Sequence, residues 1–234
     1  METETAVFQE DDLSSRKAAL IAGIGLLIMV LTVPFAEFQI FPKLINYKDP
    51  VETAQNISAQ KLLFGLGIFL NFITILCDVV VAWALYVFLK PVNQSFSLLT
   101  AWFRLVYTGV YLMALMNLLK VFSLLKSETY FQALDQGQAS DLILFHVRSF
   151  GVEWTFGLIL FGIYLLLLGF LVIKATYIPS WLGWLLVLAG IGYVVNSSGS
   201  FLFPTVNTDF LTITFVGELI FMVWLLVKGT RVAH

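Results

Sequence analysis

Residues 69–112 read FLNFITILCDVVVAWALYVFLKPVNQSFSLLTAWFRLVYTGVYL, and this stretch decides the fold. Two long apolar runs flank the short polar segment KPVNQS at residues 90–95, where Pro91 is a helix-ending signal. Helices joined by so short a connection pack as antiparallel neighbours. Each run carries one deep charge, Asp78 in the first and Arg104 in the second.

The composition indicates that lipid is the solvent of this fold. Of the 234 residues, 59% are hydrophobic and 12% are charged, whereas a soluble domain has about 25% charged residues. We therefore expect the lipid bilayer as a partner. The net charge of −2 predicts no nucleic-acid partner, because binding phosphates needs clustered basic residues. The single cysteine, Cys77, excludes an internal disulfide and a CxxC metal or redox site.

The predicted fold class is all-α, a polytopic membrane protein with a bundle of six transmembrane helices. Helices are the default because a single apolar segment can satisfy its own backbone in lipid only as a helix. Hydropathy places the spans at about residues 17–37, 62–89, 97–123, 143–173, 179–199 and 208–228. They form one transmembrane domain over residues 17–230, preceded by a polar segment at residues 1–16.

The connections are predicted to be short inner loops and longer outer loops. Residues 90–95 and 174–180 are short, whereas residues 38–61, 124–142 and 199–208 are longer and more polar. Lysine and arginine near span ends mark the cytoplasmic side of a membrane protein. The basic residues on the side of the short loops are Arg16, Lys17, Lys90, Lys174, Lys228 and Arg231. We therefore expect both termini, including the segment 1–16, to be cytoplasmic.

Asp78 and Arg104 lie at similar depths in their two spans. A charge at the centre of a membrane helix costs roughly 2.5–3.5 kcal/mol, so neither should face lipid unpaired. We predict a buried ion pair between them, in which the guanidinium binds the carboxylate with two nitrogens. This pair can be a structural clamp between two helices or part of a substrate or proton site, and both interpretations stay open.

Other polar residues lie within the spans or at their ends. Helical spacing places His146, Glu153 and Tyr164 on one stripe of the fourth span, with Arg148 on the opposite side. Glu218 is central in the sixth span and is the partner expected for Tyr164. We expect an outward-facing polar cavity that reaches half the membrane depth. The residues of its ligand or proton site are predicted to be Glu37, Asn71, His146, Glu153, Tyr164, Asn196 and Glu218.

Some of these features also have simpler interpretations. His146 and Arg148 can extend to the lipid headgroups at the membrane interface without any ligand. Trp154 is expected to belong to an aromatic belt at that interface. Glycines are expected to permit close approach of helices, and they occur at positions 151, 157, 162, 169, 183, 190 and 192.

Three stretches of the chain resemble a known family. They are residues 64–112, residues 156–197 (FGLILFGIYLLLLGFLVIKATYIPSWLGWLLVLAGIGYVVNS) and residues 217–229 (GELIFMVWLLVKG). Together they are similar to the prokaryotic membrane family called domain of unknown function 4386, over about residues 15–230. The resemblance implies a bacterial inner-membrane protein with six spans. It supplies no established activity.

The family pattern also bears on a metal site. It carries a histidine shortly before the fourth span, matched here by His146, and a second histidine where this chain has Tyr164. That departure argues against a two-histidine metal or haem site. We therefore expect no metal and no cofactor.

Three functions are consistent with these patterns. The first is binding or transport of a small molecule, a lipid or a proton through the polar cavity. The second is a non-catalytic regulatory or scaffolding role, because every charge has a plausible structural use. The third is an intramembrane hydrolase in which His146, with Glu37 or Glu153, activates water with or without a metal. We favour a protein that is not an enzyme, and the sequence leaves its oligomeric state open.

Overall fold

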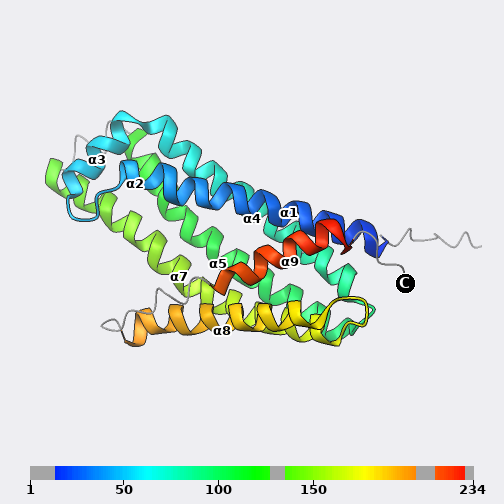
Figure 1. Ribbon diagram of the computed structural model, residues 1–234. Helices are drawn as coiled ribbons and strands as arrows, with labels where there is room; N and C mark the ends of the chain where they lie inside the picture. The colour runs from blue at the N-terminus through cyan, green and yellow to red at the C-terminus, as the bar shows by residue number, and fades with distance from the viewer. Residues whose placement is uncertain (1–13, 127–134, 204–213, 230–234) are drawn as a thin grey trace, which may run out of the picture.

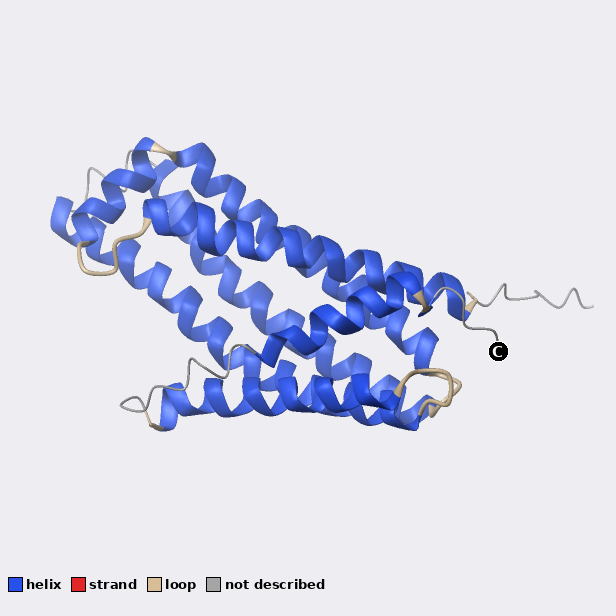
Figure 2. Cartoon of the chain, viewed as in Figure 1, coloured by secondary structure: helices blue, strands red, loops and turns tan. Residues whose placement is uncertain are grey.

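The computed structural model describes residues 14–126, 135–203 and 214–229, and every element in these ranges is helical (Figures 1 and 2). The predicted N-terminal segment 1–16 therefore lies almost wholly outside the described residues, as does residue 230. The elements are α1 (Ser15–Phe35), the π-helix η1 (Ala36–Ile40), α2 (Phe41–Leu44), α3 (Pro50–Ala59), α4 (Lys61–Leu89), α5 (Gln94–Lys126), α7 (Gln136–Lys174), α8 (Ser180–Leu202) and α9 (Val216–Val227).

Five helical segments are long and apolar enough to cross a membrane. They are Ser15–Leu44, Lys61–Leu89, Gln94–Leu125, Gly137–Lys174 and Ser180–Leu202. The sixth expected span appears as α9, an apolar helix of 12 residues. Residues 204–213, which would contain the start of that span, lie outside the described residues. The described part of the chain thus has five helices with the length and apolar composition of membrane spans.

The long helices pack in chain order. α1 lies against α4, α4 against α5, α5 against α7 and α7 against α8, while α9 packs on both α8 and α1. Figure 1 shows α1 and α4 along one side of the bundle, α7 and α8 along the other, and α9 between them. One end of the bundle carries α3, and we call it the α3 end. The turns at Lys90 and Ala175 lie at the opposite end.

Three helices are longer than a membrane requires. α4, α5 and α7 have 29, 33 and 39 residues, which at about 1.5 Å per residue exceeds a hydrocarbon core of about 30 Å. α7 already begins at Gln136, before the expected start of its span. The extra length of α7 lies at the α3 end, where α7 packs against α3 (Figure 1).

The segment 38–61, expected to be a loop, is mostly helical. Pro34 lies in the last turn of α1, the π-helix η1 follows α1 directly, and α2 continues to Leu44. α3 then begins at Pro50, where the side chain of the N-cap Asp49 accepts a hydrogen bond from the backbone N–H of Glu52. The cap and the proline at the first helical position are ordinary helix-start signals. A hydropathy scan does not detect them, because α3 is too polar to be a span.

α7 and α8 approach each other through paired glycines. A Cβ on Gly183 would lie 2.6 Å from the carbonyl oxygen of Gly169, and a Cβ on Gly190 would lie 2.7 Å from that of Gly162. Because the added Cβ would meet a backbone oxygen in each case, no side-chain movement can remove the steric clash. Gly151, in contrast, has nothing within 4 Å of an added Cβ. The expectation of close glycine packing therefore holds for Gly162, Gly169, Gly183 and Gly190 but not for Gly151.

We predict that Gly183→Ala lowers the free energy of unfolding by about 1–3 kcal/mol, because the added methyl group must push α8 away from α7. Thermal unfolding of the purified protein in detergent measures this change. Gly109→Ala is the matched control, since an added Cβ there meets nothing within 4 Å. The control should unfold at the same temperature or slightly higher, because alanine is the better helix former. An equal loss in both variants would contradict the close contact.

Candidate functional site

A cavity of about 220 Å³ lies at the centre of the bundle, and each of the long helices and α9 contributes to its wall. Most of the wall is apolar, as expected for a membrane protein interior. Its polar side chains are Thr74 from α4, Arg104, Tyr107 and Tyr111 from α5, Trp154 from α7, Tyr193 from α8 and Glu218 from α9. Polar groups from helices far apart in the sequence therefore converge on one space.

Arg104 is the most constrained polar residue of this wall. Its Nη2 lies 2.6 Å from Oδ1 of Asp78, and both side chains are fully buried. Its Nη1 donates a hydrogen bond of 2.6 Å to the hydroxyl oxygen of Tyr164. The guanidinium carbon also lies 4.9 Å from the centre of the Tyr164 ring. Arg104 thus ties α5 to α4 through Asp78 and to α7 through Tyr164.

Two details differ from the sequence-based expectation for these residues. The two terminal nitrogens of Arg104 are divided between Asp78 and Tyr164 instead of both binding the carboxylate. Tyr164 was expected to bond Glu218, but its hydroxyl oxygen accepts from Arg104. The reason is the packing order, because α7 lies against α5, whereas α9 lies against α1 and α8.

Glu218 interacts with α8. The hydroxyl group of Tyr193 lies within reach to donate a hydrogen bond to the Glu218 carboxylate. Oε1 of Glu218 is buried and has no hydrogen-bond partner among the described residues. Asp78, Arg104 and Glu218 together carry two carboxylates and one guanidinium, so one negative charge is left when all three are ionised. Such a site favours a proton, a cation or a hydrogen-bond donor.

An aromatic layer covers the cavity toward the α3 end. The indole Nε1 of Trp154 donates to the hydroxyl oxygen of Tyr107 at 3.2 Å. The Trp154 ring stacks on Tyr111 with 5.5 Å between ring centres, and Tyr107 stacks on Tyr111 at 6.0 Å. Trp154 was expected in the aromatic belt at the membrane interface, yet its N–H group is used inside the bundle. Trp154 is half-buried, and a tryptophan N–H group inside a protein needs such a partner, which explains its position.

A second polar cluster lies behind this layer at the end of α1. The hydroxyl group of Tyr111 donates to Oδ1 of the fully buried Asn71, and the Asn71 side chain is also within hydrogen-bonding reach of the Glu37 carboxylate. Glu37 stands in the π-helix η1, and single π-turns inside helices are frequent at functional sites. Glu37 and Asn71 therefore connect to the cavity through Tyr111 and do not line it themselves.

A third cluster is centred on Asn117 of α5. Its Nδ2 donates to Oε2 of Glu153 at 2.9 Å, and its Oδ1 lies 3.3 Å from Nδ1 of His146. Lys120 contacts the same Oδ1 at 3.4 Å. His146 and Glu153 are both half-buried and point to one amide, as their shared helical stripe predicts. This cluster lies between α5 and α7 and is separate from the cavity wall.

Arg148 contacts the connection between α2 and α3 instead of the Asn117 cluster. Its Nη2 donates to the backbone carbonyl oxygen of Tyr47 at 2.6 Å. Tyr47 lies outside the spans, and burial raises the pKa of its hydroxyl group. The nearby Glu37 carboxylate raises this pKa further, while the Arg148 guanidinium lowers it. Arg148 thus holds the end of α7 to this connection.

The structure therefore distributes the seven expected site residues instead of gathering them around one cavity. Glu218 lines the cavity, Tyr164 lies directly behind Arg104, and Glu37 with Asn71 reaches it through Tyr111. His146 and Glu153 belong to the Asn117 cluster, and Asn196 is a half-buried residue of α8 that does not line the cavity. Among the described residues, no three His, Cys, Asp or Glu side chains are grouped as metal ligands.

Sequence reasoning missed several residues of the cavity wall. Tyr107 and Tyr111 follow Arg104 at spacings of three and seven residues, and the sequence places all three on one helix face, but the expected site did not include the two tyrosines. Tyr193 gave no comparable signal, because it stands among apolar residues of α8 and its partner Glu218 is on another helix.

The chain belongs to the family described as Domain of unknown function (DUF4386), which matches residues 21–229. A protein of Archaeoglobus fulgidus, described as uncharacterized, is 35% identical over 163 residues, which is 70% of this chain and 83% of that protein. No solved structure matches the chain. These comparisons establish the family and assign no activity to it.

We predict that removing either partner of the Asp78–Arg104 pair costs about 3–5 kcal/mol, because an uncompensated charge is left in the interior. The double variant Asp78→Asn with Arg104→Gln should cost less than the two single losses added together. Thermal unfolding of the three variants in detergent measures this coupling. Strictly additive losses would mean that the two side chains do not interact.

Proposed function

We propose that this member of a family of unknown function binds a small molecule or a proton in its central cavity and transports it across the membrane. The observation that carries the proposal is the carboxylate of Glu218. Glu218 lines the cavity, and its Oε1 is buried and has no hydrogen-bond partner among the described residues. Burying an unpaired polar group is costly, and an ionisable residue inside a membrane span is typically functional.

The size and wall of the cavity define the ligand class. Its volume of about 220 Å³ is below the roughly 300–1,000 Å³ of sites for drug-sized molecules. Apolar residues such as Leu158 and Met222 form much of the wall, and Glu218 and Arg104 supply its charges. The ligand is therefore a small molecule with an apolar body and a protonated amine or hydroxyl group, whose donor binds the Glu218 carboxylate. A proton on Glu218 fills the same role when no ligand is present.

The access route is proposed to run from the α3 end. The Glu37–Asn71 pair lies between that end and Tyr111 of the cavity wall, and the Asn117 cluster supplies further polar groups between α5 and α7. We propose that the α3 end faces outward, so that the cavity is reached from outside at half the membrane depth. The polar residues along this access route are then Glu37, Asn71, His146 and Glu153. Glu218 binds the ligand in the cavity.

The topology belongs to the same proposal. The protein is a multi-pass protein of the cell inner membrane with six spans, the last of them including α9. Lys90, Lys174 and Lys228 stand at the end opposite α3, and such basic residues near span ends favour the cytoplasm. Both chain termini are therefore cytoplasmic.

One observation favours a purely structural role as the second candidate. Asp78, Arg104 and Tyr164 are buried and joined to one another, so they can hold α4, α5 and α7 together without any ligand. Glu218 distinguishes the two candidates, because it stands outside this network and a structural clamp does not need its carboxylate.

The Glu218 site can be tested with a panel of small amines and alcohols. A compound that binds the folded protein raises its unfolding temperature. We expect some members of the panel to stabilise the wild-type protein, and Glu218→Gln to weaken their binding roughly 10- to 100-fold by losing a charged hydrogen bond. Thermal unfolding and calorimetric titration in detergent measure both effects.

Glu52→Gln is the matched control for this experiment. Glu52 is an exposed carboxylate of α3 that accepts a hydrogen bond from Asn46, so its loss should leave binding unchanged. A panel that stabilises wild type and Glu218→Gln equally would refute the cavity site and favour the structural candidate.

The topology can be tested by labelling single cysteines in a Cys77→Ala background. Lys48 and Thr176 are both exposed and lie at opposite ends of the bundle. We expect a membrane-impermeant maleimide to label Lys48→Cys in intact cells and Thr176→Cys only after the cells are opened. The reverse pattern would place the α3 end in the cytoplasm.

A further inference from the structure

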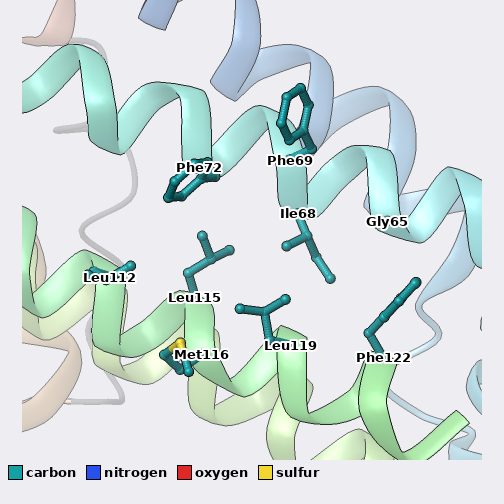
Figure 3. A pocket seen from close by; sticks show the side chains of 9 residues that line it. All are labelled: Gly65, Ile68, Phe69, Phe72, Leu112, Leu115, Met116, Leu119 and Phe122. Atoms are coloured by element: carbon teal, nitrogen blue, oxygen red, sulfur yellow. The ribbon is translucent and has the colours of Figure 1, made fainter. Parts of the chain in front are cut away.

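A larger groove lies on the outer surface of the bundle between α4 and α5 (Figure 3). Its volume is about 420 Å³, and every lining side chain is apolar. In Figure 3, Ile68 of α4 and Leu115 of α5 point toward each other across the space between the helices, whereas the Phe69 ring projects away from α5. The lining residues include Gly65, Phe69 and Phe72 from α4 and Leu112, Met116 and Phe122 from α5.

The groove opens to the surroundings of the protein. Phe69 is 57% exposed and Met116 is 46% exposed, whereas Leu115 at the base is 1% exposed. Both helices are long and apolar enough to cross a membrane. The mouth of the groove therefore faces lipid, and an occupant can enter sideways from the bilayer.

The length of the groove matches one lipid leaflet. Its residues on α5 run from Leu112 to Phe122, which corresponds to about 15 Å of helix. This is half of a hydrocarbon core of about 30 Å. Gly65 keeps the groove open at its α3 end, since a Cβ there would already lie 3.3 Å from Cε2 of Phe122. The shape thus suits one extended acyl chain of the leaflet at that end.

A positive charge stands at the same end of the groove. Lys61 lies one helical turn before Gly65 on α4, so the two residues share a face. Its Nζ donates to the backbone carbonyl oxygen of Leu125 on α5 at 2.9 Å and so bridges the two walls. An ammonium group has three donors, and Lys61 is exposed, so further donors can reach a headgroup. Lys120, in contrast, is turned toward Asn117.

We propose that the α4–α5 groove is a binding site for an anionic phospholipid, with one acyl chain between the two helices and the headgroup phosphate at Lys61. The acyl chain packs against the apolar walls of the groove. The phosphate supplies the charge that complements the ammonium group, and attraction of basic residues to anionic headgroups is well established for membrane proteins. This site is separate from the central cavity and does not depend on its ligand.

Native mass spectrometry of the detergent-solubilised protein tests the acyl-chain part of the proposal. The probes are phosphatidylglycerol and phosphatidylcholine with identical acyl chains. Met116→Trp should fill the groove and reduce the binding of both lipids. Met113→Trp is the matched control, because Met113 is 69% exposed on the same helix and does not line the groove. Gly65→Leu fills the groove from α4 and takes the place of Met116→Trp if that variant does not fold.

The same measurement with Lys61→Gln tests the headgroup. One lysine near an anionic surface corresponds to about a five-fold change in affinity, so Lys61→Gln should weaken phosphatidylglycerol about five-fold and leave phosphatidylcholine unchanged. Lys43→Gln, an exposed lysine of α2 at the α3 end, should change neither. Equal binding by Met116→Trp and Met113→Trp would overturn the groove site. Equal affinity of the wild-type protein for the two lipids would overturn the role of Lys61.

Discussion

The buried guanidinium of Arg104 is the constraint on which the arrangement of this bundle depends. A charge near the middle of a membrane helix cannot remain without partners, and the side chain of Arg104 is 1% exposed. Asp78 on α4 supplies the opposite charge, and Tyr164 on α7 supplies an acceptor for the other terminal nitrogen. Satisfying one side chain thus brings three helices to defined positions around the centre of the bundle.

The same constraint explains why Glu218 does not belong to the network of Asp78, Arg104 and Tyr164. Arg104 forms its ion pair with Asp78 and interacts with Glu218 only through the electrostatic field, without an ion pair among the described residues. The group within hydrogen-bonding reach of Glu218 is the neutral hydroxyl group of Tyr193. A purely structural network would gain from replacing Glu218 by an apolar residue, since burying an incompletely paired polar group costs free energy. The chain nevertheless places this carboxylate at the cavity wall. Because the fold does not require the Glu218 carboxylate, its position in the cavity wall is the physical reason to regard the cavity as a binding site.

The sequence predicted the features that depend on depth and helical periodicity. Asp78 and Arg104 could be paired because a short turn joins their two helices, so the depth of each residue in the membrane can be counted from the same point. His146 and Glu153 could be placed on one helix face by their seven-residue spacing. The partner of Tyr164 could not be predicted in this way, because it depends on which helices pack together. Neither could the separation of Glu37, Asn71 and Glu153 from the cavity wall. α3 was missed because hydropathy detects spans, while this helix is specified by the cap of Asp49 and by Pro50.

α5 separates two different environments along its length. Arg104, Tyr107 and Tyr111 turn toward the central cavity, whereas Leu112, Met116 and Leu119 turn toward the groove. Because protein interiors are closely packed, a movement of α5 at the groove also moves the residues of α5 that line the cavity. Occupation of the lipid-facing groove and the position of Arg104 are therefore linked through one rigid element. A lipid bound in the proposed groove would therefore contact the same helix that carries Arg104, Tyr107 and Tyr111.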